Sequence, residues 1–275
     1  MKKTLINLCA LSSIAVATSC SDQQSTNQQS KSIVIYYSQT HATEQVANII
    51  AKSVCADIDS IVAEQPYNGT FDETVSRCKN ELDNGVFPAI KPTGKDIANY
   101  DTIYVGFPVW CGVAAPPMRT WVKNADLSNK VIIPFCTFGS GGLESSVIDF
   151  ENNLTQNVSF NEGYGVRNAR LAKAEEEVEE FLIRNGIKAG EAEELDSFSN
   201  METLNDEEKS IFNAACGDYP FPLGTPIGVK SRKTKKGTEY DFITRMDISI
   251  PRESEVFVIV SNEEGAKPEF TKVVR

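Results

Sequence analysis

The sequence predicts an α/β fold in which one parallel β-sheet carries helices on both faces. Between residues 32 and 187, apolar runs of strand length alternate with amphipathic segments of helix length, a pattern typical of repeated β-α units. The first run, Ile33–Tyr37, is almost continuously apolar, as expected of a central strand that is covered on both faces. Val46, Ile50 and Val54 then recur at helical spacing, which predicts an amphipathic helix after this strand.

The same two patterns predict the elements that follow. The expected strands are Ala56–Ala63, Thr102–Phe107, Lys130–Cys136 and, at the edge, Val158–Val166. The expected helices are Phe71–Leu82, Met118–Lys123 (opened by two prolines), Leu143–Leu154 and Ala169–Asn185. Ligands of parallel sheets bind beyond the carboxyl ends of the strands. We therefore expect a site at three loops, residues 38–43, 108–115 and 137–142.

The first loop has the composition of a phosphate site. Ser38, Thr40 and Thr43 offer hydroxyl groups beside the free N–H groups of a helix N-terminus, where the helix dipole favours an anion. Neither G-x-x-x-x-G-K-[ST] nor G-x-G-x-x-G occurs at this position, so a single phosphomonoester, such as that of flavin mononucleotide (FMN), fits better than a nucleoside triphosphate or a dinucleotide. An ordinary helix capped by Ser or Thr is the alternative.

The second and third loops offer a flat ring and flexible backbone. Trp110 follows a strand and precedes Gly112, so a heteroaromatic ligand could lie against it, although such an aromatic residue often serves packing alone. Gly139, Gly141 and Gly142 lie in a strand-to-helix turn, where glycines free backbone amides for a ligand or simply form the turn. The convergence of three such loops at one sheet edge points to a binding site.

Residues 32–187 resemble the flavodoxin family. The motifs are SQTHAT at 38–43, GFPVW at 106–110 and NKVIIPFCTFGSGG at 129–142. The resemblance implies a five-stranded sheet of order 2-1-3-4-5 and bound FMN. The residues implied to hold the phosphate are Ser38, Gln39, Thr40, His41, Ala42 and Thr43. Those implied to border the isoalloxazine are Pro108, Val109, Trp110, Cys111 and Gly112 on one side and Thr137, Phe138, Gly139, Ser140, Gly141 and Gly142 on the other.

Two positions depart from the family pattern. His41 stands where these proteins usually have Gly, and it is strained if the backbone there needs a positive φ. Cys111 stands where an aromatic residue is common. His41 is the single histidine and no C-x-x-C pair occurs, so neither a metal site nor a Ser-His-Asp triad is expected. Small buried apolar residues are the favoured interpretation of the cysteines, and a disulfide stays open.

The resemblance implies electron transfer through FMN, and no catalytic residue is assigned. Reduced flavin tends to become an anion, and a low-dielectric pocket in a protein of net charge −11 disfavours that charge. One carboxylate within about 8 Å costs on the order of 2 kcal/mol at an effective dielectric near 20. We therefore favour one-electron carriage to a redox protein or a small-molecule acceptor. The alternatives are an FMN-dependent NAD(P)H reductase acting on a quinone or similar acceptor, and a binding lipoprotein that has lost flavin.

Residues 1–20 resemble a bacterial lipoprotein signal peptide. A positive start precedes an apolar stretch that is too short to span a bilayer, and small residues precede Cys20. The resemblance implies export and a lipid on Cys20, which anchors the protein to a bacterial membrane on its periplasmic or cell-surface side. An ordinary secretory signal is the alternative. Residues 21–31 are polar and read as a tether. The acidic charge argues against nucleic acid as a partner.

A second, smaller unit is expected after an acidic linker at 188–203. Residues 204–275 predict one helix followed by strands, an α+β arrangement: helix Leu204–Cys216, then strands Thr225–Ser231, Thr238–Ile250, Glu255–Ser261 and Glu269–Val274. Their order resembles the cystatin-like fold, but the inhibitory Q-x-V-x-G hairpin is missing, so protease inhibition is not implied. Arg232–Lys236 forms one basic cluster, read as a solvated hairpin tip or, alternatively, as a docking patch for an acidic partner.

Replacing Cys20 should abolish lipid attachment. Because the signal implies acylation at this cysteine, the Cys20→Ala variant should accumulate as an unlabelled precursor when cells are fed radiolabelled palmitate. A Cys111→Ala variant serves as the control and should keep its label. Normal labelling of Cys20→Ala would contradict the assignment.

Overall fold

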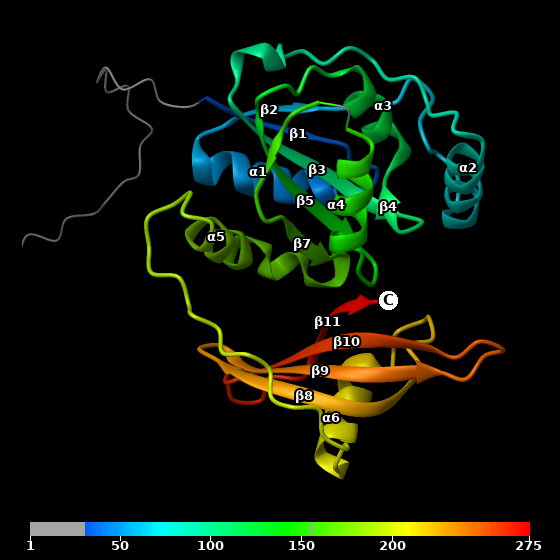
Figure 1. Cartoon of the computed structure of the whole chain (residues 1–275), viewed down its shortest axis with the longest axis vertical. Helices are drawn as coiled ribbons and strands as arrows, with labels where there is room; N and C mark the ends of the chain where they lie inside the picture. Colours follow the sequence, from blue (N-terminus) through cyan, green and yellow to red (C-terminus); the bar gives the residue numbers. More distant parts are fainter. Residues whose placement is uncertain (1–30, 155) are drawn as a thin grey trace, which may run out of the picture.

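The computed structural model describes residues 31–154 and 156–275 as two packed units (Figure 1). The first unit, residues 32–184, is built on a sheet of order β2-β1-β3-β5 that continues with β6 and β7. The strands are β1 (Ser32–Tyr36), β2 (Asp57–Ser60), β3 (Thr102–Trp110), β5 (Val131–Phe138), β6 (Ser159–Phe160) and β7 (Tyr164–Arg167). All these pairings are parallel. The predicted fold class and the order 2-1-3-4-5 are confirmed.

The edge strand is one element that the sequence predicted wrongly. A single strand was expected at 158–166, but β6 pairs with residues 131–132 of β5 and β7 with residues 135–138. Pro134 lies in the gap between these two paired segments. Proline has no N–H to donate to a neighbouring strand, so the ladder is interrupted there and the edge strand is split.

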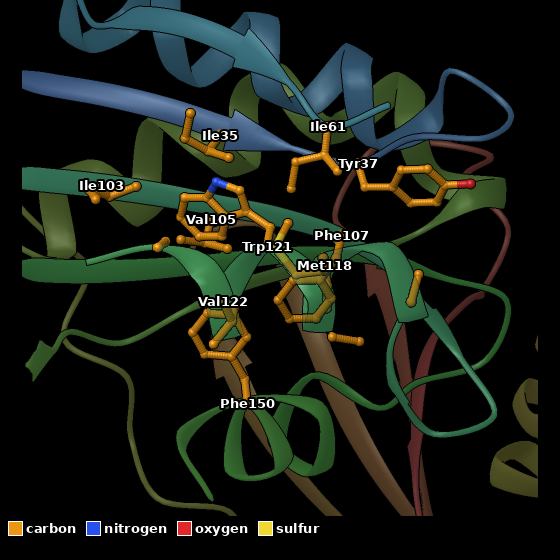
Figure 2. Packing of buried hydrophobic residues seen from close by; sticks show 14 of the residues in the cluster. Ile35, Tyr37, Ile61, Ile103, Val105, Phe107, Met118, Trp121, Val122 and Phe150 are labelled. Atoms are coloured by element: carbon orange, nitrogen blue, oxygen red, sulfur yellow. The ribbon is translucent and has the colours of Figure 1, made fainter. Parts of the chain in front are cut away.

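Alternate side chains of the central strands feed two cores. Ile33 and Ile35 face one side of β1, and Val34 and Tyr36 face the other, as the two-residue strand period requires. Helices α1 (Ala42–Val54) and α5 (Ala174–Arg184) cover the second side. Helices α3 (Pro116–Asn124) and α4 (Leu143–Asn152) cover the first, and Figure 2 shows Met118, Trp121, Val122 and Phe150 of these helices packed against Ile35, Val105 and Phe107 of the strands.

The remaining elements of the first unit differ modestly from expectation. The helix predicted at 71–82 is α2 (Phe71–Asn84), whose N-terminus is closed by a reciprocal capping box between Thr70 and Glu73. Strand β3 extends three residues further than predicted and pairs with β4 (Val113–Ala114). The helix predicted at 169–185 is divided into a 3-10 segment, η2 (Asn168–Lys173), and α5. A short 3-10 turn, η1 (Ile97–Asn99), precedes β3.

The second unit, residues 206–274, is a helix packed on a four-stranded antiparallel sheet. Its elements are α6 (Asp206–Cys216), β8 (Thr225–Thr234), β9 (Gly237–Met246), β10 (Arg252–Ser261) and β11 (Glu269–Val274), with the sheet order β11-β10-β9-β8. Phe212 of α6 meets Phe242 of β9 with ring centroids 5.2 Å apart. The α+β arrangement is confirmed; β9 ends four residues earlier than predicted. The likeness to cystatins stays a prediction.

Strand β11 joins the second unit to the third loop of the first (Figure 1). The Val273 N–H donates to the Ser140 carbonyl at 2.8 Å. A Cβ added at Gly141 would lie 2.0 Å from the Val273 carbonyl oxygen, so only glycine allows this approach. Arg167 of β7 donates from Nη1 to the Phe270 carbonyl at 2.7 Å and from Nε to the Gly139 carbonyl at 2.9 Å. The third loop and β11 are therefore fixed to each other through their backbones.

Ion pairs also connect the two units. Lys272 of β11 pairs with Glu144 of α4, and Arg170 of η2 pairs with Glu269 at 3.0 Å. Lys236, in the basic cluster, contacts Glu176 at 3.0 Å and Glu180 at 2.7 Å, both on α5. The cluster was expected chiefly as a solvated hairpin tip; instead, one of its lysines meets an acidic helix of the same chain.

Gly141→Ala should weaken the attachment of β11. Its methyl group would displace the Val273 carbonyl, and such overpacking typically costs about 1–3 kcal/mol. We expect a lower free energy of unfolding in urea and faster hydrogen exchange at the Val273 amide. Gly139→Ala is the matched control, because an added Cβ there meets no atom within 4 Å. Equal effects of the two substitutions would contradict the contact.

Candidate functional site

A cavity of about 1020 Å³ lies at the carboxyl ends of the central strands. We call it the loop pocket, because all three predicted loops line it. The predicted residues that line it are Gln39, Thr40, Val109, Trp110, Cys111, Gly112, Gly139, Ser140, Gly141 and Gly142. The predicted residues outside its lining are Ser38, His41, Ala42, Thr43, Pro108, Thr137 and Phe138. The structure thus brings the ends of the three loops together around one space.

Another cavity of similar size, about 1060 Å³, lies between α5, the edge strands and the second unit. Of the predicted site residues it contains only Phe138, and charged side chains such as Glu176, Glu180 and Lys236 surround it. Lys236 of the second unit already pairs with Glu176 and Glu180 of the first. We therefore regard this cavity as a polar part of the interface between the two units and not as the candidate site.

The first loop ends in a helix N-terminus that no side chain caps. His41 is the N-cap of α1, and its φ of 63° and ψ of 0° lie in the left-handed region. Its side chain is 87% exposed and contacts the Glu44 carboxylate, so the imidazole points away from the pocket. The first N–H groups of α1 are left without a side-chain acceptor, which is the arrangement that binds anions.

Thr43 and Thr137 are buried outside the pocket lining and bind each other. Both residues are 1% exposed, and their hydroxyl oxygens lie 2.9 Å apart in a hydrogen bond. The resemblance implied that Thr43 contacts the phosphate of a ligand and Thr137 its ring. In the structure the two side chains join the first loop to the third, which fixes the spacing between these two loops.

Trp110 is held in place from behind by an aromatic and ionic cluster. Its ring meets the Tyr67 and Tyr37 rings edge-on, with centroids 4.9 and 5.8 Å apart. The Tyr67 hydroxyl donates to Glu81 at 2.6 Å, and the Arg77 guanidinium lies 3.7 Å from the Tyr67 ring centroid. Burial raises the pKa of Tyr37 to about 12, so this phenol is neutral at physiological pH. Trp110 therefore presents a rigid, uncharged surface.

The turn after Trp110 explains the local glycine. Val109 pairs with Ala114 and Trp110 with Val113, which leaves Cys111 and Gly112 as a two-residue hairpin turn. Both have positive φ, 52° and 84°, as turns that match the twist of a hairpin require. Gly112 thus serves the turn. Cys111 is exposed and free, so the expectation of a small buried residue was wrong here, whereas Cys78, Cys136 and Cys216 are buried.

Two walls of the loop pocket were missed by sequence reasoning. One is the face of α2, with Phe71, Thr74, Val75 and Cys78. The other comes from the second unit and comprises Tyr219, Phe221, Pro222, Met246, Val273, Val274 and Arg275. The α2 wall had one local signal, an aromatic residue at the first position of an otherwise polar helix. The second unit had none, because no local pattern encodes where it packs.

The pocket lining carries little charge. Among the described residues that line it, only Glu144 and Arg275 have side chains that carry a charge at neutral pH. Burial raises the pKa of Glu144, but the hydrogen bond from Lys272, a backbone hydrogen bond and the positive charge of Lys272 together hold the pKa below its usual value. The Glu144 carboxylate is therefore ionised and already paired with a lysine.

Comparison with known proteins identifies the family. Residues 31–183 match the family model described as Flavodoxin, which is more than half of the chain. The protein belongs to the flavodoxin family. Two flavoprotein crystal structures, from Bacteroides eggerthii and Bacteroides uniformis, are 24% and 25% identical to it, with TM-scores of 0.49. They cover 58% and 55% of this chain, and 99% and 98% of their own chains are covered.

A flavoprotein from Lactobacillus acidophilus, solved in complex with FMN, is also similar. It is 22% identical, has a TM-score of 0.45 and covers 52% of this chain, with 97% of its own chain covered.

None of the helices in the described part of this flavodoxin has the length and apolar composition that a membrane span requires. The same residues contain no group of three or more His, Cys, Asp or Glu side chains placed to hold a metal ion.

Substitutions at His41 should reveal the left-handed backbone of this flavodoxin. A non-glycine residue in that conformation costs about 1–2 kcal/mol, part of which glycine gives back as greater freedom of the unfolded chain. We expect His41→Gly to leave the free energy of unfolding unchanged or to raise it by up to about 1 kcal/mol. His41→Val should lower it, because β-branched residues are outliers at positive φ. Urea unfolding measures both, and a Val variant as stable as the Gly variant would contradict the geometry.

Proposed function

We propose that this protein binds FMN and transfers electrons through it. The observation that carries the proposal is the convergence of three loops, in a member of the flavodoxin family, on one pocket at the carboxyl ends of the parallel strands. That edge is where sheets of this kind bind their ligands. When bound, FMN supplies the redox chemistry, and the protein supplies its position and electrostatic surroundings.

The first loop has the features that a phosphate needs. The N-terminus of α1 has no side-chain cap, and its dipole favours a negative group. Thr40 lines the pocket and is exposed, so its hydroxyl is available as a donor. The backbone of His41 lies in the left-handed region immediately before the helix. These groups would hold the phosphate without a lysine.

The second and third loops have the features that a flat ring needs. Trp110 is fixed in orientation by Tyr37 and Tyr67, and the turn at 111–112 and the loop at 139–142 bring backbone to the edges of the pocket. Among the described side chains that line the pocket, only Arg275 and the paired Glu144 are charged. A surrounding of low polarity disfavours added charge on a bound ring, and this supports transfer of one electron at a time.

A second candidate function is reduction of a small molecule by an FMN-dependent reductase that uses a nicotinamide cofactor. The observation that favours it is the cover that the second unit places over the pocket through Tyr219, Phe221 and Val273, since such a cover leaves less room for a protein partner at the flavin. A flavodoxin scaffold that has lost flavin and serves binding alone is the remaining alternative.

One measurement separates these functions. The protein without its first 30 residues is purified, and its visible spectrum is recorded with and without added FMN. Bound FMN that NADH or NADPH reduces rapidly supports a reductase, and bound FMN that these donors do not reduce supports a carrier. Failure to bind FMN would overturn the proposal in favour of a binding scaffold.

We further propose that the protein acts at a bacterial membrane, to which the lipid on Cys20 attaches it. Cys20, the signal at 1–20 and most of the tether at 21–31 lie outside the described residues, so support comes from the sequence pattern alone. An exported carrier would exchange electrons with a redox protein or a small-molecule acceptor on the periplasmic or cell-surface side.

Thr40→Ala should weaken the binding of FMN but not of riboflavin. A hydrogen bond to a charged group contributes about 1.5–3 kcal/mol, which corresponds to roughly a ten- to hundredfold change in the dissociation constant. Riboflavin lacks the phosphate and should bind Thr40→Ala as it binds the unaltered protein. Titrations followed by flavin fluorescence measure both constants, and Thr93→Ala, outside the pocket, is the control. Equal losses for the two ligands would mean that the loop does not hold the phosphate.

A further inference from the structure

The second unit contributes an aromatic wall to the loop pocket. Phe221 and Tyr219 lie in the segment between α6 and β8, and both line the pocket that Trp110 borders in the first unit. Their rings meet edge-on with centroids 5.7 Å apart. An aromatic surface of this kind, in the same pocket as the loops proposed to hold FMN, is suited to a second flat ligand.

This wall is rigid. The Tyr219 ring packs on Phe270 of β11 with centroids 5.1 Å apart, and the Arg167 guanidinium lies 5.3 Å from the Tyr219 centroid. Arg167 also binds the Phe270 carbonyl and the Gly139 carbonyl. One arginine of the first unit therefore fixes both the third loop and the wall, so the distance across the pocket is set before any ligand enters. Such preorganisation favours binding.

Exposed apolar side chains gather at the same pocket. Phe71 of α2 is 70% exposed, Ile148 of α4 is 57% exposed and Phe221 is 52% exposed, and all three line it. These residues come from three separate elements, two in the first unit and one in the second. Exposed apolar groups that converge on one concave site mark a binding surface, here one for an apolar ligand.

The pocket is large for a single ligand. Its volume of about 1020 Å³ reaches the upper end of the range, roughly 300–1,000 Å³, typical of small-molecule sites. The three loops account for one side of this space and the second unit for another. A flat molecule can therefore lie against the second unit while a flavin lies along the loops.

We propose that the second unit forms the acceptor side of the flavin site and that the loop pocket binds a flat, uncharged aromatic electron acceptor of the quinone class against Tyr219 and Phe221. This inference rests on the proposed binding of FMN. A quinone can accept electrons singly: one electron converts it to its semiquinone anion, and a second electron with two protons from solvent completes the quinol, so this acceptor class is compatible with a carrier of single electrons. The one side-chain carboxylate of the described lining, Glu144, is already paired with Lys272, which favours an uncharged ligand over a cationic one.

The probe for this site is duroquinone, whose fully substituted ring leaves no free position for addition of the exposed Cys111 thiol. Its binding to the FMN-loaded protein is measured by equilibrium dialysis, and FMN binding is measured separately by fluorescence titration. Phe221→Ala should weaken duroquinone binding about tenfold and leave the FMN dissociation constant unchanged. Because Phe221 is half exposed, its removal does not threaten the fold. Ile250→Ala, at an exposed apolar residue of the same unit outside the pocket, should change neither constant.

The outcomes distinguish this inference from the function on which it rests. FMN that binds normally, together with duroquinone that does not bind or binds Phe221→Ala as tightly as the unaltered protein, would overturn the acceptor wall alone. A protein that does not take up FMN would overturn the proposed function, and the acceptor role with it. Selective loss of duroquinone binding in Phe221→Ala, with FMN retained, supports both.

Discussion

Parallel pairing of β1, β3 and β5 is the constraint on which the rest of this structure depends. The register of these strands, with Tyr36 beside Gly106 and Pro108 beside Thr137, ends them at the same edge of the sheet. Each loop that follows therefore starts from the same place. The hydrogen bond between Thr43 and Thr137 then fixes the separation of the first and third loops. A binding pocket arises at this edge because backbone geometry places the loops there, before any side chain is chosen for a ligand.

Most of the first unit could be predicted from the sequence because its signals are local. A continuous apolar run such as Ile33–Tyr37 predicts a buried strand, and the spacing of Val46 and Ile50 predicts a helix. The split of the edge strand at Pro134 also had a local signal, since proline interrupts a ladder. The resemblance placed His41 at a position where the family usually has glycine, which raised the question of a positive φ there. The structure shows that His41 does have a positive φ.

The composition of the site could be predicted only in part, because packing between distant segments decides it. The loop motifs indicated Thr40, Trp110 and Gly139 as lining residues, and they line the pocket. Nothing in the local pattern indicated that Tyr219 and Phe221 would line the same pocket. Gly141 shows why: a glycine in a turn suggests contact with a ligand, yet here it admits the Val273 carbonyl of another unit.

The docking of β11 also has a consequence for the order of folding. Lys272 and Glu144 are separated by 128 positions along the chain, and closing a loop of that length carries an entropic cost that local contacts do not. The sheet of the first unit and its three loops can therefore form before β11 docks against them. The pocket would then pass through a stage in which its floor is complete and one wall is missing. A flavin present at that stage would meet an open site, whereas the mature protein offers a narrower one.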